Sequence, residues 1–252
     1  MALHYLRRLT GRERTPAGNL QLARLLAFVA GAINAGGFLA VQQYTSHMSG
    51  IVSSVADELV LGEITLALAA LGVLISFISG AACTALMVNW ARRQHLHSEY
   101  ALPLMLEALL LLGFGLLGGN LDRVRWLFAP AAVTLLGFLM GLQNAIITKI
   151  SHAEMRTTHV TGLVTDIGIE LGKLMYLNGR SSGNAAHPPV RADRAKLWML
   201  TSLVGLFLLG GLVGALGFKY VGFGFAVPLA ALLVVLATVP VLDDFSMRMR
   251  RN

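Results

Sequence analysis

The sequence predicts an all-α membrane protein, a bundle of helices that crosses the lipid bilayer several times. Its 252 residues are 56% hydrophobic and only 13% charged, whereas a typical soluble domain is about 25% charged. Six apolar segments each reach the roughly 17–25 residues that a helix needs to cross the hydrocarbon core. These segments are Leu25–Val41, Ile64–Trp90, Ala101–Leu117, Trp126–Ile150, Leu197–Leu216 and Phe223–Leu242.

Each apolar segment is expected to be a helix, because backbone polar groups in lipid must be satisfied within the segment. Two further segments, Gly50–Leu61 and Gly162–Leu177, are shorter and more polar. We expect them to be half-helices that enter the membrane and return. The predicted architecture is therefore six long spans and two short interrupted helices.

The chain also repeats itself in order. Phe28-x-x-Gly31-x-x-Asn34 returns as Phe138-x-x-Gly141-x-x-Asn144, and Phe77-x-x-Gly80 returns as Phe207-x-x-Gly210. Such self-similarity predicts two internal repeats. We place them at residues 21–119 and 120–243, with a polar loop at 178–196 in the second repeat only, and with basic tails at 1–20 and 244–252.

Basic residues predict the orientation in the membrane, since cytoplasmic loops are enriched in Lys and Arg. With six spans, only Arg123, Arg125 and Lys219 lie outside, and both termini are cytoplasmic. With eight spans, more basic residues lie outside, including Arg92 and Arg93. We favour six spans, which turn the second repeat upside down relative to the first.

Two short polar islands interrupt the apolar pattern at equivalent places in the repeats. They run from Tyr44 to Gly50 and from Arg156 to Gly162. Their hydroxyl residues are expected to cap the short helices, and Gly50 and Gly162 to allow close approach. The hydroxyl residues are Thr45, Ser46 and Ser49 in the first island, and Thr157, Thr158 and Thr161 in the second.

A helix that begins inside the membrane directs free N–H groups and a positive dipole end into a cavity, which favours an anionic or polar solute. The alternative is that the hydroxyl groups only cap their own helices and hold neighbouring helices together.

Histidine and asparagine recur at matching positions, as His47 with His159 and Asn34 with Asn144. The imidazoles are candidates for proton or solute contact, with a packing role as the alternative. The amides are candidates for solute contact or for bonds between helices. Two histidines fall short of the three or four ligands of a stable metal site, so we expect no metal.

Three acids follow the islands, namely Glu58, Asp166 and Glu170. A carboxylate in mid-membrane costs roughly 2.5–3.5 kcal/mol, which makes proton coupling a candidate role. The alternative is that the short helices end at the surface, where these acids are solvated. Glu107 differs from them because its counterpart in the second repeat is Leu232.

Several other classes are disfavoured. Cys83 is the single cysteine, so no disulfide forms within the chain. The basic residues lie in short clusters between apolar segments, which is typical of cytoplasmic loops and not of nucleic-acid binding. No Walker motif and no Gly-x-Ser-x-Gly occurs, so we expect neither an enzyme nor a cofactor.

The islands Thr-Ser-His-Met-Ser-Gly, ending at Gly50, and Arg-Thr-Thr-His-Val-Thr-Gly, ending at Gly162, resemble the signature of the YoaK-like family of bacterial multi-pass membrane proteins. Gly141-Leu142-Gln143-Asn144-Ala145 is similar to the second-half pattern of that family. The resemblance covers about residues 20–243. It implies a bacterial inner-membrane protein with about six spans, and it implies no substrate and no catalytic residues.

The sequence therefore predicts a small-solute transporter or permease, with an anionic or polar solute bound between the starts of the two half-helices. Its partners would be the lipid bilayer and the solute, with a homo-oligomer possible. The alternative is a membrane scaffold or regulatory partner protein whose islands only lock the helices together.

The six-span prediction can be tested by labelling near Arg93. A cysteine replacing Arg93, in a Cys83→Ser background, should react with a membrane-impermeant maleimide only after the cells are permeabilised. Labelling of intact cells would contradict six spans and favour eight.

Overall fold

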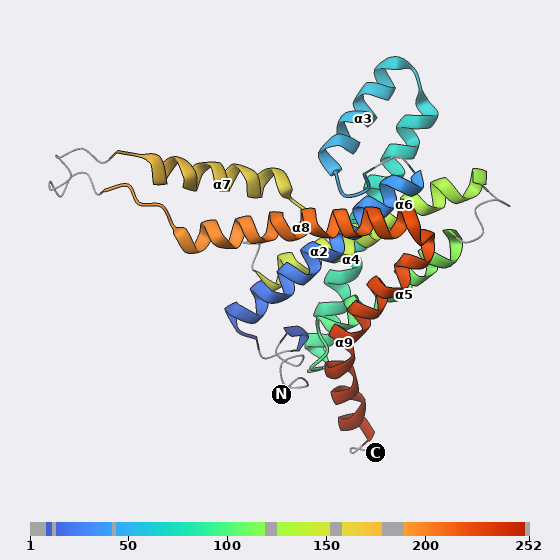
Figure 1. Ribbon diagram of the computed structural model, residues 1–252. Coiled ribbons are helices and arrows are strands. Elements are labelled where there is room, and N and C mark those ends of the chain that lie inside the picture. Colours follow the sequence, from blue (N-terminus) through green and yellow to red (C-terminus); the bar gives the residue numbers. More distant parts are fainter. Residues whose placement is uncertain are drawn as a thin grey trace.

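All the regular secondary structure of the described residues is helical (Figure 1). The computed structural model describes residues 9–11, 14–41, 44–118, 125–151, 158–177 and 189–249. Within these ranges lie eight α-helices and the short 3-10 helix η1. They are α2 (Pro16–Val41), α3 (Met48–Leu61), α4 (Ile64–Arg93), α5 (Ala101–Gly118), α6 (Arg125–Ile150), α7 (Val160–Met175), α8 (Arg194–Tyr220), η1 (Gly222–Phe225) and α9 (Ala226–Met249).

Five helical segments of the described chain are long and apolar enough to cross a membrane, and they belong to α2, α4, α6, α8 and η1–α9. The sixth apolar segment of the sequence forms the shorter helix α5, which is apolar over Ala101–Leu116. The prediction of an all-α, multi-pass membrane protein is confirmed. The two short polar segments are also helices, α3 with 14 residues and α7 with 16.

The first close helix pair is α2 with α8, which run parallel. Their backbones touch at two glycines. A Cβ added to Gly31 would lie 2.0 Å from the backbone O of Phe207, and one added to Gly210 would lie 1.9 Å from the backbone O of Phe28. Arg24 Nε donates to Ser202 Oγ at 2.8 Å on the same interface. Small residues permit such close approach of membrane helices.

The second pair, α4 with α6, has the same design. A Cβ on Gly141 would lie 1.9 Å from the backbone O of Phe77, and one on Gly80 would lie 2.1 Å from that of Phe138. Thr84 Oγ1 donates to the carbonyl of Leu142 at 2.9 Å. The two interfaces therefore use the same residue types at corresponding positions of the sequence.

The two pairs meet where α2 crosses α6 in the opposite direction. Asn19 Nδ2, near the start of α2, donates to the carbonyl of Ile150 at the end of α6 at 3.4 Å. Near the end of α2, a Cβ on Gly37 would lie 2.9 Å from Leu136 Cδ1 in the first half of α6. α5 packs along α9, where a Cβ on Gly115 would lie 3.0 Å from that of Ala226.

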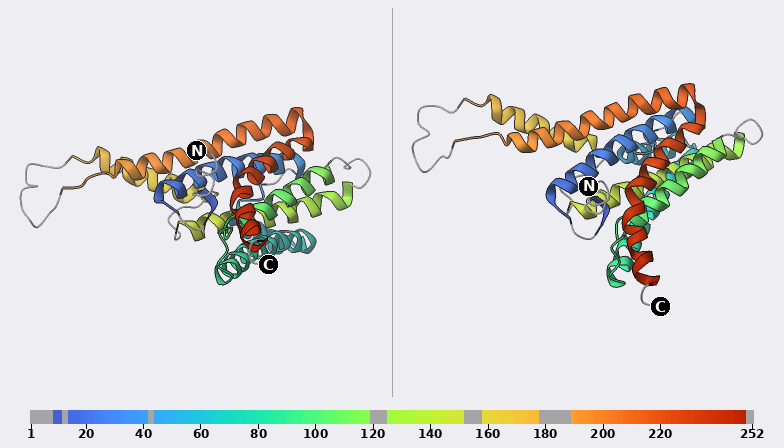
Figure 2. Two further views of the ribbon diagram at one scale, coloured as in Figure 1. Left: turned by 90° about the horizontal axis from the view of Figure 1, so that it is seen from below. Right: turned by 60° about the horizontal axis from the view of Figure 1, so that its bottom comes forward.

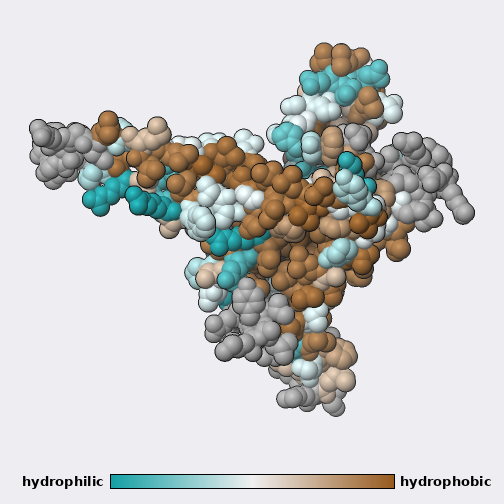
Figure 3. Space-filling model, viewed as in Figure 1, coloured by the Kyte–Doolittle hydropathy of each residue, from teal (hydrophilic) through white to brown (hydrophobic). Residues whose placement is uncertain are grey.

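Two helical arms project from this body in different directions (Figure 1). One is α3 with the start of α4, joined by a tight turn in which Gly62 adopts the left-handed conformation at φ 80°. The other is α7 with the start of α8, and Figure 2 shows it extending from the body in two further views. Figure 3 shows hydrophobic residues over much of the body, and hydrophilic ones over α3 and at the outer end of the α7–α8 arm.

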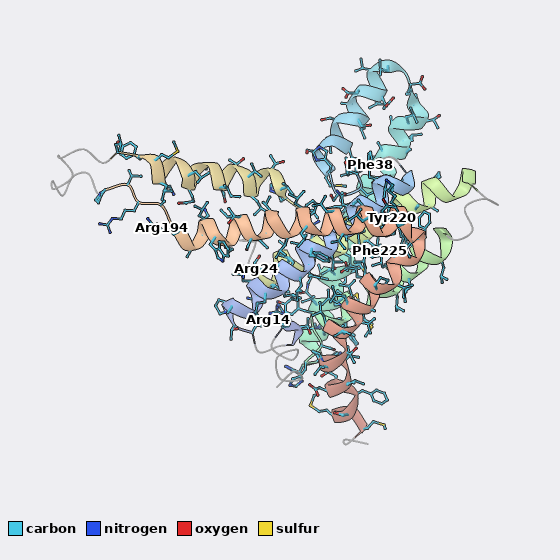
Figure 4. The ribbon with its side chains drawn as sticks, viewed as in Figure 1. Arg14, Arg24, Phe38, Arg194, Tyr220 and Phe225 are labelled. Atoms are coloured by element: carbon cyan, nitrogen blue, oxygen red, sulfur yellow. The ribbon has the colours of Figure 1, made fainter. Side chains whose placement is uncertain are left out.

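A polar cluster closes the body near the start of α2, where Figure 4 labels Arg14. The Arg14 guanidinium lies 4.7 Å from the ring centroid of Tyr100. Burial lowers the pKa of Arg14 to about 10. Arg92 donates to Glu99 at 3.0 Å and also to the Tyr100 hydroxyl. Burial raises the pKa of the Tyr100 hydroxyl.

Two glycines of α4 provide a matched test of the close packing. Gly80→Ala should destabilise the protein by roughly 1–3 kcal/mol, because the new Cβ overlaps the backbone of α6. Gly72→Ala should be neutral or stabilising, since a Cβ there meets nothing within 4 Å and alanine favours helix. Melting temperatures of the purified variants in detergent measure the difference. Equal melting temperatures would contradict the packing at Gly80.

Candidate functional site

The two polar islands line one cavity of about 1000 Å³. Parts of α2, α4, α6 and α8 complete its wall. Its lining includes Asn34, Ser46, His47 and Ser49 from the first half, and Asn144, Thr158, His159, Thr161 and Gly162 from the second. His47, Ser49, His159 and Thr161 are exposed, so the cavity is open to the surroundings of the protein.

The first island is attached to α2 by a side-chain hydrogen bond. Ser46 Oγ donates to Asn34 Oδ1 at 2.9 Å. Beside this bond, the ring of Tyr44 stacks on Phe38 with centroids 4.6 Å apart. Figure 4 labels Phe38 at the end of α2, close to the start of α3. The island is thus fixed at the end of α2 before the short helix begins.

The second island is attached to α6 in the same way. Asn144 Nδ2 donates to Thr158 Oγ1 at 2.6 Å, and the Thr158 N–H donates to Asn144 Oδ1 at 3.4 Å. Asn144 and Thr158 stand at the positions in the second half that correspond to Asn34 and Ser46 in the first. The two bonds place the starts of α3 and α7 against the same cavity.

The starts of the short helices differ from expectation. The N-cap residues are His47 and His159, and neither makes a side-chain capping bond. The prediction that the island hydroxyl groups cap the helices is therefore wrong for the described residues. Ser46 and Thr158 bond the asparagines instead, because they lie one residue before the cap and face α2 and α6.

The histidine rings lie against the first turns of their own helices. A Cβ on Gly50 would lie 2.3 Å from His47 Cδ2, and one on Gly162 would lie 2.6 Å from His159 Nδ1. Glycine is required at both positions for the ring to lie there. Gly162 lines the cavity, whereas Gly50 contributes through its contact with His47.

The electrostatics of the cavity favour negative charge. In α3 the first helical hydrogen bond runs from the N–H of Ile51 to the carbonyl of His47. In α7 it runs from the N–H of Leu163 to the carbonyl of His159. The N–H groups before Ile51 and Leu163 therefore lie at free, positive helix ends. Lys149 adds a cation, with Nζ 3.3 Å from Asn89 Oδ1. The lining residues that the structure describes include no Asp or Glu.

Three of the predicted solute-binding residues lie elsewhere or cannot be placed. Thr45 is buried beneath the first island, and its Oγ1 has no hydrogen-bond partner among the described residues. Gly50 packs under His47, as above. Thr157 lies outside the described residues. Over the described chain, no three His, Cys, Asp or Glu side chains gather in a way that could hold a metal ion.

The three predicted coupling acids do not line the cavity. Glu58 is half-buried near the end of α3. Asp166 Oδ2 lies 3.5 Å from Lys196 Nζ. Glu170 is buried between α7 and the residues before α8, where its carboxylate accepts from Lys173 Nζ at 2.8 Å and from the Asp193 N–H at 2.9 Å. Their proton-coupling role stays a prediction.

Sequence reasoning missed several residues of the cavity wall. Thr148 and Lys149 lie about one turn after Asn144 on α6, and that spacing could have pointed to them. Phe77 and Phe207 lie in the wall at corresponding positions of α4 and α8. No pattern in the sequence identifies them as lining residues, because they resemble any other apolar residue of a span.

Membrane-length helices, together with two polar breaks that meet at one cavity, define a multi-pass membrane protein. Residues 22–239 match the family described as "Protein of unknown function (DUF1275)". The match covers most of the chain, so the protein belongs to this family, which is the YoaK-like family that the islands resemble. No curated protein and no solved structure matches the chain.

The contacts of Glu170 predict a pH-dependent arm. Hydrogen bonds from Lys173 and Asp193 lower the pKa of Glu170 below its ordinary 4.5. A lowered pKa stabilises the folded arm above the ordinary pKa, and this contribution is lost as the pH falls through the folded-state pKa. Hydrogen exchange of α7 should therefore accelerate below about pH 4.5.

Glu170→Gln should give the fast exchange already at neutral pH, because the amide cannot form the ion pair with Lys173. Glu58→Gln on α3 is the matched control and should leave exchange of α7 unchanged. Slow exchange of α7 in Glu170→Gln at neutral pH would show that this carboxylate does not hold the arm.

Proposed function

We propose that this protein is a membrane permease for a small solute, most favourably an anion, which binds between the starts of α3 and α7. The observation that carries the proposal is the single cavity lined by both islands. A helix break inside a membrane is tolerated where it lines a cavity or is buried in protein. Two breaks directed at the same cavity support a solute site rather than two unrelated irregularities.

The charge of the cavity supports an anion. Two helix N-termini and Lys149 supply positive potential, and the described lining contributes no carboxylate. Backbone N–H groups at a helix start bind anions without a dedicated cation. His47 and His159, exposed on the two sides, can donate to a bound solute and add charge when protonated.

The helix directions support two inverted repeats. α2 and α6, the first helices of the two proposed repeats, run antiparallel. This follows from the Asn19–Ile150 and Gly37–Leu136 contacts. The Gly–Phe contacts of α2 with α8 recur at equivalent positions of α6 with α4. Inverted repeats whose interrupted helices meet at a central site are typical of secondary transporters.

The proposal includes an orientation in the membrane. Inverted repeats at 21–119 and 120–243 require an odd number of crossings per repeat, so α3 and α7 enter the bilayer and return. Both termini are then cytoplasmic, and the family resemblance supports a location in a bacterial inner membrane. Glu58, Asp166 and Glu170 would act in proton coupling only through movement of the two arms, since none of them lines the cavity.

One observation favours a second function, that of a non-transporting scaffold or regulatory partner. The Asn34–Ser46 and Asn144–Thr158 bonds satisfy these side chains within the protein, as helix-locking residues would be. The scaffold predicts that the cavity holds no solute. Exposure of both histidines favours the permease, because residues that only lock helices together would be buried.

Anion flux into proteoliposomes tests the permease. Chloride, nitrate, acetate, phosphate and sulfate are offered in turn to the purified full-length protein. Lys149→Met should reduce the flux of the accepted anion roughly tenfold, because a hydrogen bond to a charged group is worth about 1.5–3 kcal/mol. His47→Ala combined with His159→Ala should reduce it further.

Lys219→Met is the matched control, since Lys219 is exposed at the end of α8 and is absent from the cavity wall. It should transport like the unmodified protein. If all five anions fail to cross, or if Lys149→Met and the double histidine variant transport normally, the anion site is excluded.

A further inference from the structure

Glu107 is a fully buried acid with no hydrogen-bond partner among the described residues. It lies in the middle of α5, its residue exposure is 0%, and both of its carboxyl oxygens are unpartnered. Other buried acids of the described chain differ in this respect. Glu99 accepts from Arg92, and Glu170 accepts from Lys173 and Asp193.

An unpaired carboxylate is unfavourable in this position. Glu107 lies within a hydrophobic core that includes Leu104, Ala108 and Leu111 from its own helix and Leu233 from α9. Burial of an ion without a partner costs far more than burial of the neutral acid, so such groups take up a proton. Burial in this conformation therefore favours the neutral form of the Glu107 carboxyl group.

The described charged side chains on the helices around α5 make other contacts or are exposed. On α9, Asp244 accepts from the N–H groups of His97 and Ser98, and Asp243 lies beside it near the end of that helix. On α6, Lys149 bonds to Asn89. On α4, Arg92 pairs with Glu99 while Arg93 is exposed. η1 carries no charged residue. None of these groups is hydrogen-bonded to Glu107.

The position itself does not require an acid. In the proposed repeat, the counterpart of Glu107 is Leu232 on α9. Gln143 on α6 is a second buried polar residue of this kind. Neither of its amide atoms has a hydrogen-bond partner among the described residues, and its counterpart is Ile33. Each of these two buried polar side chains therefore corresponds to an aliphatic side chain in the other half of the chain.

We propose that Glu107 is a proton-binding site, protonated in the conformation described here and ionised when the helices around α5 separate and admit water. The site would couple a proton to the conformational change of the permease. This coupling rests on the proposed function, whereas proton binding does not. The ligand is the proton, and α5 with its neighbours α9 and α6 forms the element that opens.

Infrared spectroscopy of the purified full-length protein tests proton binding directly. A protonated carboxyl group has a carbonyl stretch that an ionised carboxylate lacks. At neutral pH this band should be present in the unmodified protein and absent from Glu107→Gln. It should be retained in Glu170→Gln, because Glu170 is paired with Lys173 and does not contribute to the band. An unmodified protein without the band, or a band retained in Glu107→Gln, would overturn the proposal.

A second measurement uses the melting temperature in detergent between about pH 5 and pH 9. The folded protein holds a proton on Glu107 that the unfolded chain releases, so stability should fall as the pH rises. Glu107→Gln should lose this part of the pH dependence. Glu107→Leu, which copies Leu232, should behave in the same way and serves if the glutamine variant does not fold. An unchanged pH dependence in both variants would overturn the proposal.

The coupling is tested separately in proteoliposomes that show anion flux. Glu107→Gln should abolish the response of the flux to a pH gradient, and a response equal to that of the unmodified protein would exclude coupling through Glu107. The infrared and melting measurements involve no transported solute. If no anion is transported, the infrared and melting measurements can still be interpreted. If Glu107 binds no proton, anion flux should still be observed.

Discussion

Backbone contact at four glycines determines the arrangement of the bundle. Gly31, Gly80, Gly141 and Gly210 each allow the carbonyl of a phenylalanine on the neighbouring helix to lie where a Cβ would be. These contacts unite α2 with α8 and α4 with α6. Asn34 and Asn144 follow Gly31 and Gly141 by three residues, so the packing that joins the helices also directs both amides toward the islands.

Much of this fold could be predicted from the sequence, because it depends on the length and apolarity of segments. All six apolar segments are helices, and the two polar segments form the short helices α3 and α7. The two similar islands were also expected to lie together, and both line one cavity. Local helix propensity alone would not indicate this. The five helices of membrane length and the shorter α5 could not be distinguished, since Ala101–Leu117 has a composition similar to the others.

Details of the site were less predictable because they depend on the direction in which each side chain points from its helix. Ser and Thr before a helix usually cap it, but here a histidine holds the cap position and the hydroxyl groups face the preceding long helix. Lys149 was not recognised, since its role depends on which face of α6 meets the cavity. The acids were recognised by type. Glu170, however, is paired with Lys173 toward the end of α7. The buried acid of the described chain whose carboxyl oxygens have no hydrogen-bond partner is Glu107.

The connections of the two arms differ in kind. α3 is joined to α4 through Gly62 and Glu63 alone, so covalent geometry fixes one side of the cavity. α7 is separated from α8 by residues 176–193. Two polar contacts join them, the Asp166–Lys196 ion pair and the hydrogen bond from the Asp193 N–H to Glu170. Dissolved ions screen exposed charge pairs but do not change a two-residue turn. Ionic strength therefore weakens the Asp166–Lys196 contact between α7 and α8 and leaves the Gly62–Glu63 connection between α3 and α4 unchanged.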